Sequence, residues 1–233
     1  MATQVLAYLG TAAGIALALS PVPTIRTILQ AKSIGDYTVF PYIVTFCQSA
    51  LWGTYAIVTP DKLSLIPVNA LVAGLELVYC VIFYMYATER SAILKTIGYP
   101  LGITVLMILL SLISASPSKF VGFFAVIANI VMYAAPLAVV KTVIETQSVK
   151  YMPFLLSFIG FLSSLVWTSW ALSANDQFVL VPNVLGAVLG AIQLAVFFKY
   201  HNGESDDKPS ILPTSIGQVV PAHATGERQV LIN

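Results

Sequence analysis

Residues 20–55 read SPVPTIRTILQAKSIGDYTVFPYIVTFCQSALWGTY, and residues 135–170 read APLAVVKTVIETQSVKYMPFLLSFIGFLSSLVWTSW. The second stretch repeats the first about 115 residues later, so that Pro21 returns as Pro136 and Trp52 as Trp167. Further along, Asn69 returns as Asn183, with one residue lost from a loop. A duplicated apolar unit that keeps the same few polar and kinking residues is typical of a transporter, whose substrate site lies between the repeats near the middle of the membrane.

The composition places the repeats in a membrane. Of the 233 residues, 58% are hydrophobic and 9% are charged, whereas a soluble domain carries about 25% charged residues. Apolar runs of about 20 residues predict transmembrane helices. We expect seven, at 4–29, 40–58, 64–87, 97–115, 119–144, 154–173 and 177–200. The first is not a cleavable signal peptide, because it lacks a basic leading region and its pattern recurs at 120–144.

A three-helix unit leaves the membrane on the side opposite to its start, so a second copy that followed directly would be inverted. The fourth helix has no counterpart in either copy and turns the chain back. We therefore predict an all-α polytopic membrane protein with two parallel three-helix repeats and a linker helix, a 3+1+3 plan. The predicted units are residues 1–95, the linker 96–117, the second repeat 118–200 and a disordered cytosolic tail over 201–233.

The basic residues predict the orientation. Nine of the eleven lysines and arginines fall on the side that holds the loops after the first, third and fifth helices and the C-terminal tail. The other two are Lys62 and Lys119. The positive-inside rule then places the N-terminus outside or in a lumen and the C-terminus in the cytosol. The net charge of +1 gives no indication of a nucleic-acid partner, and Cys47 and Cys80 lie inside predicted spans, so no disulfide framework is expected.

Prolines recur in both copies near the cytosolic side. Pro21 and Pro136 lie toward the ends of the first and fifth helices, where each removes the amide that would bond the carbonyl of Leu17 or Met132. Pro41 and Pro153 fall at the cytosolic starts of the second and sixth helices, where proline suits a first helical turn. We interpret the four as a ring of hinges at the cytosolic end.

A second paired set lies deeper, in the middle to outer part of the membrane. Trp52 and Asn69 form one half and Trp167 and Asn183 the other, with the polar residues Gln48 and Ser163 one turn before each tryptophan. Amides bond hydroxyl groups and indole rings cover apolar C–H surfaces, which suits a neutral polyol. The alternative is that these tryptophans pack between helices and these amides join helices by hydrogen bonds.

Ionisable residues are scarce within the spans. Glu76 is the one acid well inside a span, Gly190 takes its place in the second copy, and both histidines follow the last helix. We expect Glu76 to be structural, bonded to backbone or hydroxyl groups. Proton-coupled carriers usually display an intramembrane relay of such groups, so uncoupled transport of an uncharged solute fits better. No metalloprotease motif, aspartate pair or serine–histidine pair is present, so we expect no enzyme, no cofactor and no metal site.

The duplicated patterns SPVPTIRTILQAKSIGDYTVFPYIV…LWGTYA and AAPLAVVKTVIETQSVKYMPFLLS…VWTSWAL…FVLVPNVLGAVLG resemble the SWEET sugar facilitators from about residue 5 to 200. The resemblance implies bidirectional sugar uniport by alternating access, with the four prolines as hinges and the paired tryptophans and asparagines as the sugar pocket. It implies an outer gate in which Tyr55 bonds Asp176, a plasma or vacuolar membrane, and assembly that can extend to a homo-oligomer. Gln48 is bulkier than the residues usual at its position, and Ala56 and Ala171 replace common glycines.

Substrate size follows from the same resemblance. In the family, bulky residues at the places of Leu17 and Met132 go with monosaccharides, so these two residues are expected to line the pathway of a hexose such as glucose. Two alternatives remain open at this point. A seven-helix receptor fits the duplicated plan poorly, and a proton-coupled exporter of amino acids on a related fold would require Glu76.

Overall fold

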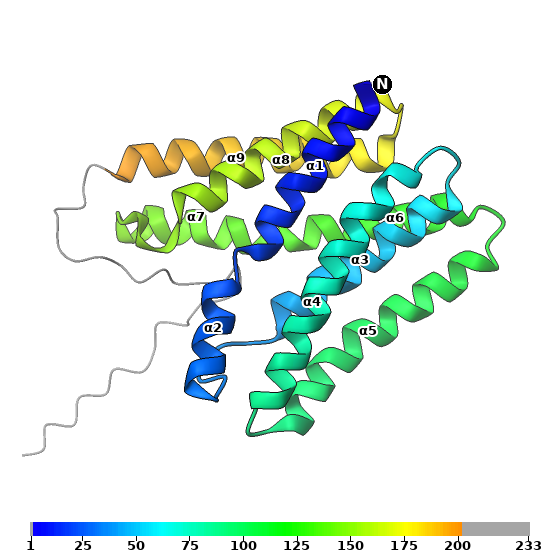
Figure 1. Ribbon diagram of the computed structural model, residues 1–233. Helices are drawn as coiled ribbons and strands as arrows, with labels where there is room; N and C mark the ends of the chain where they lie inside the picture. The colour runs from blue at the N-terminus through cyan, green and yellow to red at the C-terminus, as the bar shows by residue number, and fades with distance from the viewer. Residues whose placement is uncertain (1, 202–233) are drawn as a thin grey trace, which may run out of the picture.

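The computed structural model describes residues 2–201, apart from the side chain of Tyr151. The tail expected over 201–233 lies outside the described residues, except for His201, which ends the last helix. The helices are α1 (Ala2–Leu19), α2 (Val22–Ala31), α3 (Phe40–Val58), α4 (Ile66–Tyr86), α5 (Arg90–Leu112), α6 (Pro117–Met132), α7 (Ala134–Thr146), α8 (Phe154–Ser173) and α9 (Gln177–His201), with 3-10 turns at Leu63–Leu65 and Val149–Tyr151 (Figure 1).

The first and fifth predicted spans are each broken into two helices at matching places. α1 gives way to α2 around Pro21, and α6 gives way to α7 at Tyr133, three residues before Pro136. The Leu17 carbonyl was expected to lack a hydrogen bond, but it accepts one from the Ser20 amide at 3.1 Å. Pro136 falls in the first turn of α7, where a missing amide costs no helical bond. The chain thus accommodates both prolines by restarting a helix.

The seven spans of the predicted plan are confirmed as seven membrane-length helical segments, two of which are the broken pairs. Six of them are long and apolar enough to cross a bilayer by length and composition. The remaining one is α3, whose 19 residues reach about 28 Å but include Thr45, Gln48 and Thr54. Since α3 joins a repeat whose other two helices span, it crosses as well. The all-α polytopic fold class is confirmed.

Each repeat arranges its helices in the same order. The third helix of the repeat lies between the first and the second: α4 packs on α1 and α3, and α9 packs on α6 and α8. Between repeats, α1 packs on α8 and α3 packs on α6, so the first helix of each repeat lies against the second helix of the other. The linker α5 lies beside α3, α4 and α6 (Figure 1). This exchange of contacts is what two parallel copies about a shared axis produce.

The backbone repeats itself down to single dihedral angles. Lys32 and Gln147 end α2 and α7 in the left-handed conformation, with φ of 52° and 54°. Asp61 and Asn175 do the same in the loops after α3 and α8, with φ of 61° and 50°. A non-glycine residue rarely adopts this conformation, so its recurrence at matching places shows that the loops as well as the helices were duplicated.

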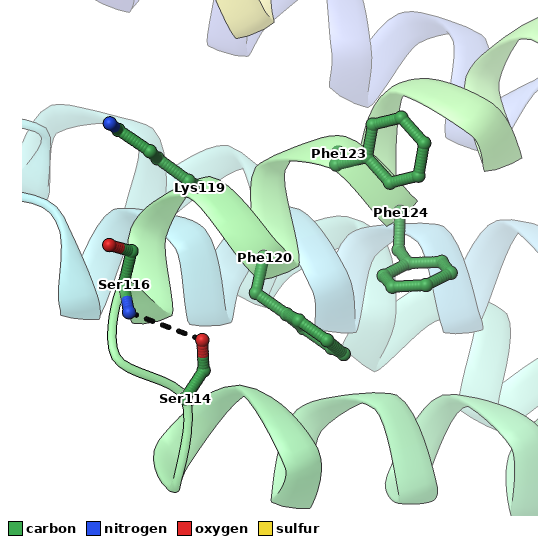
Figure 2. Close-up of a pocket in the computed structure, with 6 residues that line it drawn as sticks. All are labelled: Ser114, Ser116, Lys119, Phe120, Phe123 and Phe124. Carbon is green, nitrogen blue, oxygen red and sulfur yellow. Dashed lines mark hydrogen bonds between the residues drawn. The ribbon is translucent and has the colours of Figure 1, made fainter.

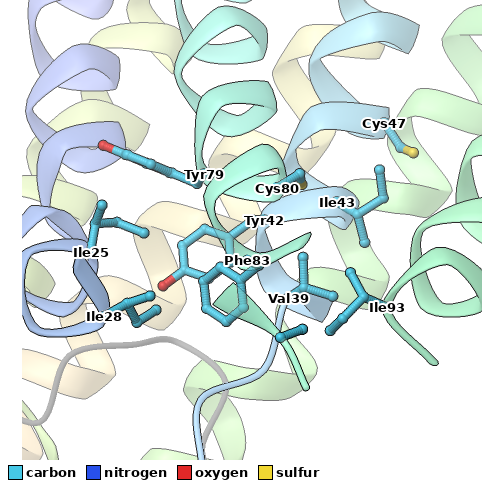
Figure 3. Packing of buried hydrophobic residues seen from close by; sticks show 11 residues of the cluster. Ile25, Ile28, Val39, Tyr42, Ile43, Cys47, Tyr79, Cys80, Phe83 and Ile93 are labelled. Atoms are coloured by element: carbon cyan, nitrogen blue, oxygen red, sulfur yellow. The ribbon is translucent and has the colours of Figure 1, made fainter. Parts of the chain in front are cut away.

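Buried side chains divide the bundle into two ends. A cluster that includes Ala7, Tyr55, Val121 and Trp170 joins both repeats at the end that holds the loop between α8 and α9, which we call the gate end. At the opposite end, the proline end, each repeat packs separately. Ile28, Val39, Tyr42 and Phe83 belong to a cluster of the first repeat and α5 (Figure 3), and Val140, Val143, Val149 and Met152 to one of the second repeat. Among the described residues, the one buried cluster that joins both repeats therefore lies at the gate end.

Candidate functional site

The predicted site residues Trp52 and Gln48 meet at a residue that the sequence did not single out, Asn129 of α6. Its Oδ1 accepts a hydrogen bond from Trp52 Nε1 at 3.0 Å and another from Gln48 Nε2. Asn129 Nδ2 donates to the Tyr133 hydroxyl at 3.3 Å, and that hydroxyl donates to the Pro182 carbonyl at 2.6 Å. One side of the interface between the repeats is thus spanned by a chain of polar contacts from α3 through α6 to α9.

Asn69 and Asn183 have the same local geometry in the two repeats. Asn69 Nδ2 donates to the Leu65 carbonyl at 2.8 Å, and Asn183 Nδ2 donates to the Val179 carbonyl at 2.7 Å, in each case one turn back on its own helix. Within residues 2–201 neither side-chain oxygen has a hydrogen-bond partner in the protein. Each carboxamide is therefore held by one bond to its helix and keeps an acceptor and a second N–H available.

Trp167 lies across the other side of the interface, against α1. A Cβ placed on Gly10 would come within 2.5 Å of the Trp167 ring, so a side chain there would displace the indole. Both Trp52 and Trp167 pack on the cluster that closes the gate end. Ser163 is buried one turn before Trp167, and Leu17 and Met132 are partly buried. The described contacts place Trp52 with Gln48 and Trp167 with α1, and they do not join the two tryptophans directly.

The gate end is closed by polar and aromatic contacts between the repeats. The Tyr55 hydroxyl lies 3.0 Å from each carboxylate oxygen of Asp176. Lys62, from the loop after α3, donates to the Ala174 carbonyl at 2.7 Å and lies 3.4 Å from Asp176 Oδ2. Its ammonium group also lies 5.4 Å from the ring centroid of Trp170, the counterpart of Tyr55 in the second repeat. Asp176 thus receives both a hydrogen bond and a charge from the first repeat, and its role as a gate stays a prediction.

A glycine makes this closure sterically feasible. A Cβ on Gly122 of α6 would lie 2.9 Å from Cγ of Phe178 and 3.0 Å from Cε2 of Tyr55. The Tyr55 ring also packs edge-on against Phe178, with centroids 5.8 Å apart. α6 therefore approaches the gate closely only because position 122 has no side chain.

The four prolines lie at the proline end, where the repeats are apart. Pro41 occupies the first turn of α3 and Pro153 caps the start of α8, as expected of prolines at helix starts. α2 packs on α4, and α7 packs on α6 and α9, within their own repeats. The prolines therefore lie on helix breaks and helix starts that are not fixed against the other repeat. Their role as hinges is untested by the geometry.

Glu76 was expected to bond backbone or hydroxyl groups, and the structure differs from this expectation. Its side chain is 4% exposed, and Oε2 has no hydrogen-bond partner among the described residues. The Tyr79 hydroxyl, nearly one turn further on the same helix, donates instead to the Ala18 carbonyl at 3.0 Å. The expected bond of the carboxyl to a backbone or hydroxyl group is therefore not made at Oε2.

A hollow on the outer surface has no connection to this site. A shallow groove of about 450 Å³ lies where α5 ends and α6 begins (Figure 2). It is lined by Ser114, Ser116, Lys119, Phe120, Phe123 and Phe124, and the Ser116 amide donates to Ser114 Oγ at 3.2 Å. None of the predicted site residues borders it, and its three aromatic residues are all phenylalanines.

Sequence reasoning missed Asn129, Tyr133, Lys62 and Gly122. The comparison of repeats selects residues that recur, and these do not: Asn129 has Gly14 in its place in the first copy, and Tyr133 has Ala18. One signal was available, because an asparagine within an otherwise apolar run over 120–132 has a high cost unless it is bonded.

Comparison with known proteins gives a consistent result. The family model described as "Sugar efflux transporter for intercellular exchange" matches the chain twice, over residues 4–91 and 119–205. The Arabidopsis thaliana protein named Bidirectional sugar transporter SWEET16 is 37% identical over 215 residues, which cover 88% of this chain and 93% of that protein. Bidirectional sugar transporter SWEET4 of the same plant is also 37% identical, over 89% of this chain and 86% of its own.

A solved structure of a eukaryotic SWEET transporter at 3.7 Å superposes on the fold with a TM-score of 0.82. The two chains are 32% identical, and the match covers 86% of this chain and 97% of the other. The likeness thus extends over both repeats and the linker.

We predict that Gly122→Ala slows transport at least about fivefold at an equal amount of protein in the membrane, because overpacking costs about 1–3 kcal/mol and falls on the closed gate. The measurement is uptake of labelled glucose by cells that lack their own hexose carriers. Gly74→Ala is the matched control, since a Cβ on Gly74 would meet nothing within 4 Å. Equal uptake by the two variants would contradict a steric role for position 122.

Proposed function

Because this chain belongs to the SWEET family of sugar transporters, we propose that it carries a sugar across the membrane in either direction by facilitated diffusion, with alternating access to one central site. The observation that carries this proposal is the division of the bundle into two ends. The repeats pack together at the gate end and separately at the proline end, so a substrate between them has one open route.

We infer that the sugar lies between the paired helices, level with Trp52 and Trp167. The asparagines support this assignment, because each is oriented by a bond to its own helix while its oxygen stays unpaired. A sugar hydroxyl can donate to that oxygen and accept from the second N–H, and an indole ring can cover an apolar face of the sugar. Gln48, Ser163, Leu17 and Met132 complete the proposed lining.

The proposed cycle moves one repeat against the other. In this state the gate end is closed by Tyr55, Lys62 and Asp176. Opening it breaks the contacts of Asp176 with the first repeat while the proline end closes. With the orientation that the basic residues predict, the proline end faces the cytosol, so this state is open to the inside.

Glu76 supports a second candidate function, proton-coupled exchange, because its Oε2 is buried without a partner. A carboxyl group that binds a proton during the cycle would have this environment. Two observations favour a structural role for Glu76. The second copy has Gly190 and no acid at the matching position, and Glu76 lies two turns along α4 from Asn69.

We predict that Asn69→Ala and Asn183→Ala each abolish most sugar transport while the protein stays inserted. Losing one amide leaves buried hydroxyls or protein groups unpaired, at about 1–3 kcal/mol. Labelled glucose uptake at matched surface levels is the measurement, with Ser169→Ala as control. Ser169 likewise bonds the backbone of its own helix, at 2.9 Å from the Leu165 carbonyl, but is exposed on α8. Near-normal uptake by both asparagine variants would rule out the proposed site.

Transport is expected to equilibrate the sugar and never to concentrate it. In vesicles that contain the purified protein, internal glucose should rise to the external level with or without a pH gradient. Glu76→Gln, which keeps the shape and removes the charge, should leave this endpoint unchanged. Accumulation above the external level that a protonophore abolishes, and that Glu76→Gln lacks, would establish proton coupling instead.

For substrate size, we predict that the parent carries glucose faster than sucrose and that Leu17→Val combined with Met132→Val narrows the difference. Removing methylene groups from both sides of the pathway makes room for a second sugar ring, whereas overpacking costs about 1–3 kcal/mol. The measurement is the uptake of labelled glucose and of labelled sucrose by the parent and by the variant, compared as a ratio. A parent that already prefers sucrose would show that these side chains do not set the size limit.

A further inference from the structure

The two sides of the proposed pocket are not equivalent, although the repeats are. On one side Gln48 of α3 contacts Asn129 of α6. The positions that correspond to them on the other side, about 115 residues away, are Ser163 of α8 and Gly14 of α1. The first side therefore carries two carboxamides where the second carries a hydroxymethyl group and a hydrogen atom, and only the first has a side-chain bond between the repeats here.

On this side of the pocket, the donor and the acceptor of each hydrogen bond can be assigned in only one way. The Tyr133 hydroxyl has one hydrogen, which goes to the Pro182 carbonyl, and a carbonyl only accepts. Tyr133 can therefore only accept from Asn129, which must present its N–H to Tyr133 and its oxygen to α3. The indole of Trp52 only donates, which agrees with this orientation. Asn129 is thus held as a fixed acceptor for two donors of the first repeat.

The far end of this chain of bonds lies at the break between α6 and α7. Tyr133 is the residue between the two helices, and Gly186 of α9 makes room for its hydroxyl, since a Cβ there would lie 2.6 Å from the hydroxyl oxygen. The first repeat bonds its own break differently: Tyr79 of α4 donates to the Ala18 carbonyl at the end of α1, and no bond continues from there to the pocket residues. Among residues 2–201, side-chain hydrogen bonds join only the second break to the pocket.

We propose that Asn129 is a positioning residue for transport: it orients Gln48 and Trp52 toward the sugar and, through Tyr133, links that side of the pocket to the α6–α7 break. This inference rests on the proposed function. Without Asn129 the Gln48 amide and the Trp52 N–H lose their common acceptor and take other rotamers or bond water. Without the Tyr133 hydroxyl, Trp52 Nε1 still donates to Asn129 Oδ1 and keeps the carboxamide oriented, but the break moves independently of the pocket.

The test separates these two parts with Asn129→Leu, which has a similar volume, and Tyr133→Phe, which keeps the ring. Asn129→Leu is expected to raise the KM for glucose exchange about two- to tenfold, the range of one net hydrogen bond. Tyr133→Phe is expected to leave the KM unchanged and to alter the maximal exchange rate by a similar factor. Tyr79→Phe is the control, which removes the hydroxyl that bonds the end of α1 at the break of the first repeat and should leave the KM at the parent value.

A double-mutant cycle shows whether Asn129 acts through Gln48. The KM of Gln48→Leu combined with Asn129→Leu should be no higher than that of the worse single variant, because contacting residues are not additive. Effects that multiply independently, or an unchanged KM in Asn129→Leu, would overturn the positioning role. A Tyr133→Phe protein that exchanges glucose like the parent would overturn the link to the break.

One readout needs no transport and so separates this inference from the proposed function. The tryptophan emission maximum of purified Asn129→Leu should differ from that of the parent, because Trp52 loses its acceptor on Asn129, while that of Tyr133→Phe should match the parent. If Asn129→Leu does not fold, Asn129→Ser serves, since its hydroxyl is too short to reach both donors. Unshifted emission in the folded variant overturns the positioning. A parent that moves no sugar overturns the proposed function, and the emission shift still decides the role of Asn129.

Discussion

The close approach of the two repeats at the gate end is the constraint on which the rest of the structure depends. Gly122 lets α6 approach Tyr55, and Tyr55 then reaches Asp176 across the interface. Lys62 offsets the Asp176 charge at 3.4 Å in a site where the lysine side chain is 11% exposed and the aspartate side chain 2%. With this end fixed, the repeats pack separately at the proline end, each around its own buried cluster.

The duplication accounts for the architecture and for the paired residues of the proposed site, and the differences between the two copies make that site asymmetric. Matching helix breaks, matching left-handed residues and matching asparagine bonds follow from two copies of one unit. Strict symmetry, however, would place identical groups on both sides of a small and asymmetric substrate. The differences between Gln48 and Ser163 and between Asn129 and Gly14 give the site a polar side and a compact side. A sugar, whose two faces differ, is better served by such a pocket than by a symmetric one.

Sequence reasoning reached the fold because the fold is set by features that the sequence displays directly. Apolar length sets the spans, and the repeat together with an unmatched fourth helix sets the parallel arrangement, so the predicted bounds of α3 and α8 agree with the observed ones. The spans over 4–29 and 119–144 were predicted as continuous, but the observed breaks lie within three residues of Pro21 and Pro136, since proline restricts where a helix can continue. The order of the helices within a repeat could not be predicted from the sequence, because it depends on side-chain packing between distant segments.

Residues of the candidate site could be proposed from the sequence only where the two copies carry matching residues. Trp52, Asn69 and their counterparts recur in the sequence, whereas Asn129 and Lys62 act through contacts made across the interface to partners far along the chain. Glu76 illustrates the same limit: the sequence shows a lone acid in a span, but the engagement of Tyr79 with Ala18 is a property of the packed helices.

The central claim is that the two ends open and close in opposition around one site, and paired spin labels measure this most directly. After replacement of Cys47 and Cys80, one pair goes on the exposed residues Leu63 and Ser173 at the gate end and another on Ala31 and Thr146 at the proline end. On addition of glucose in a bilayer, the account predicts that gate-end distances lengthen in the same fraction of molecules in which proline-end distances shorten. Distances that change in the same direction at both ends, or at neither end, would contradict it.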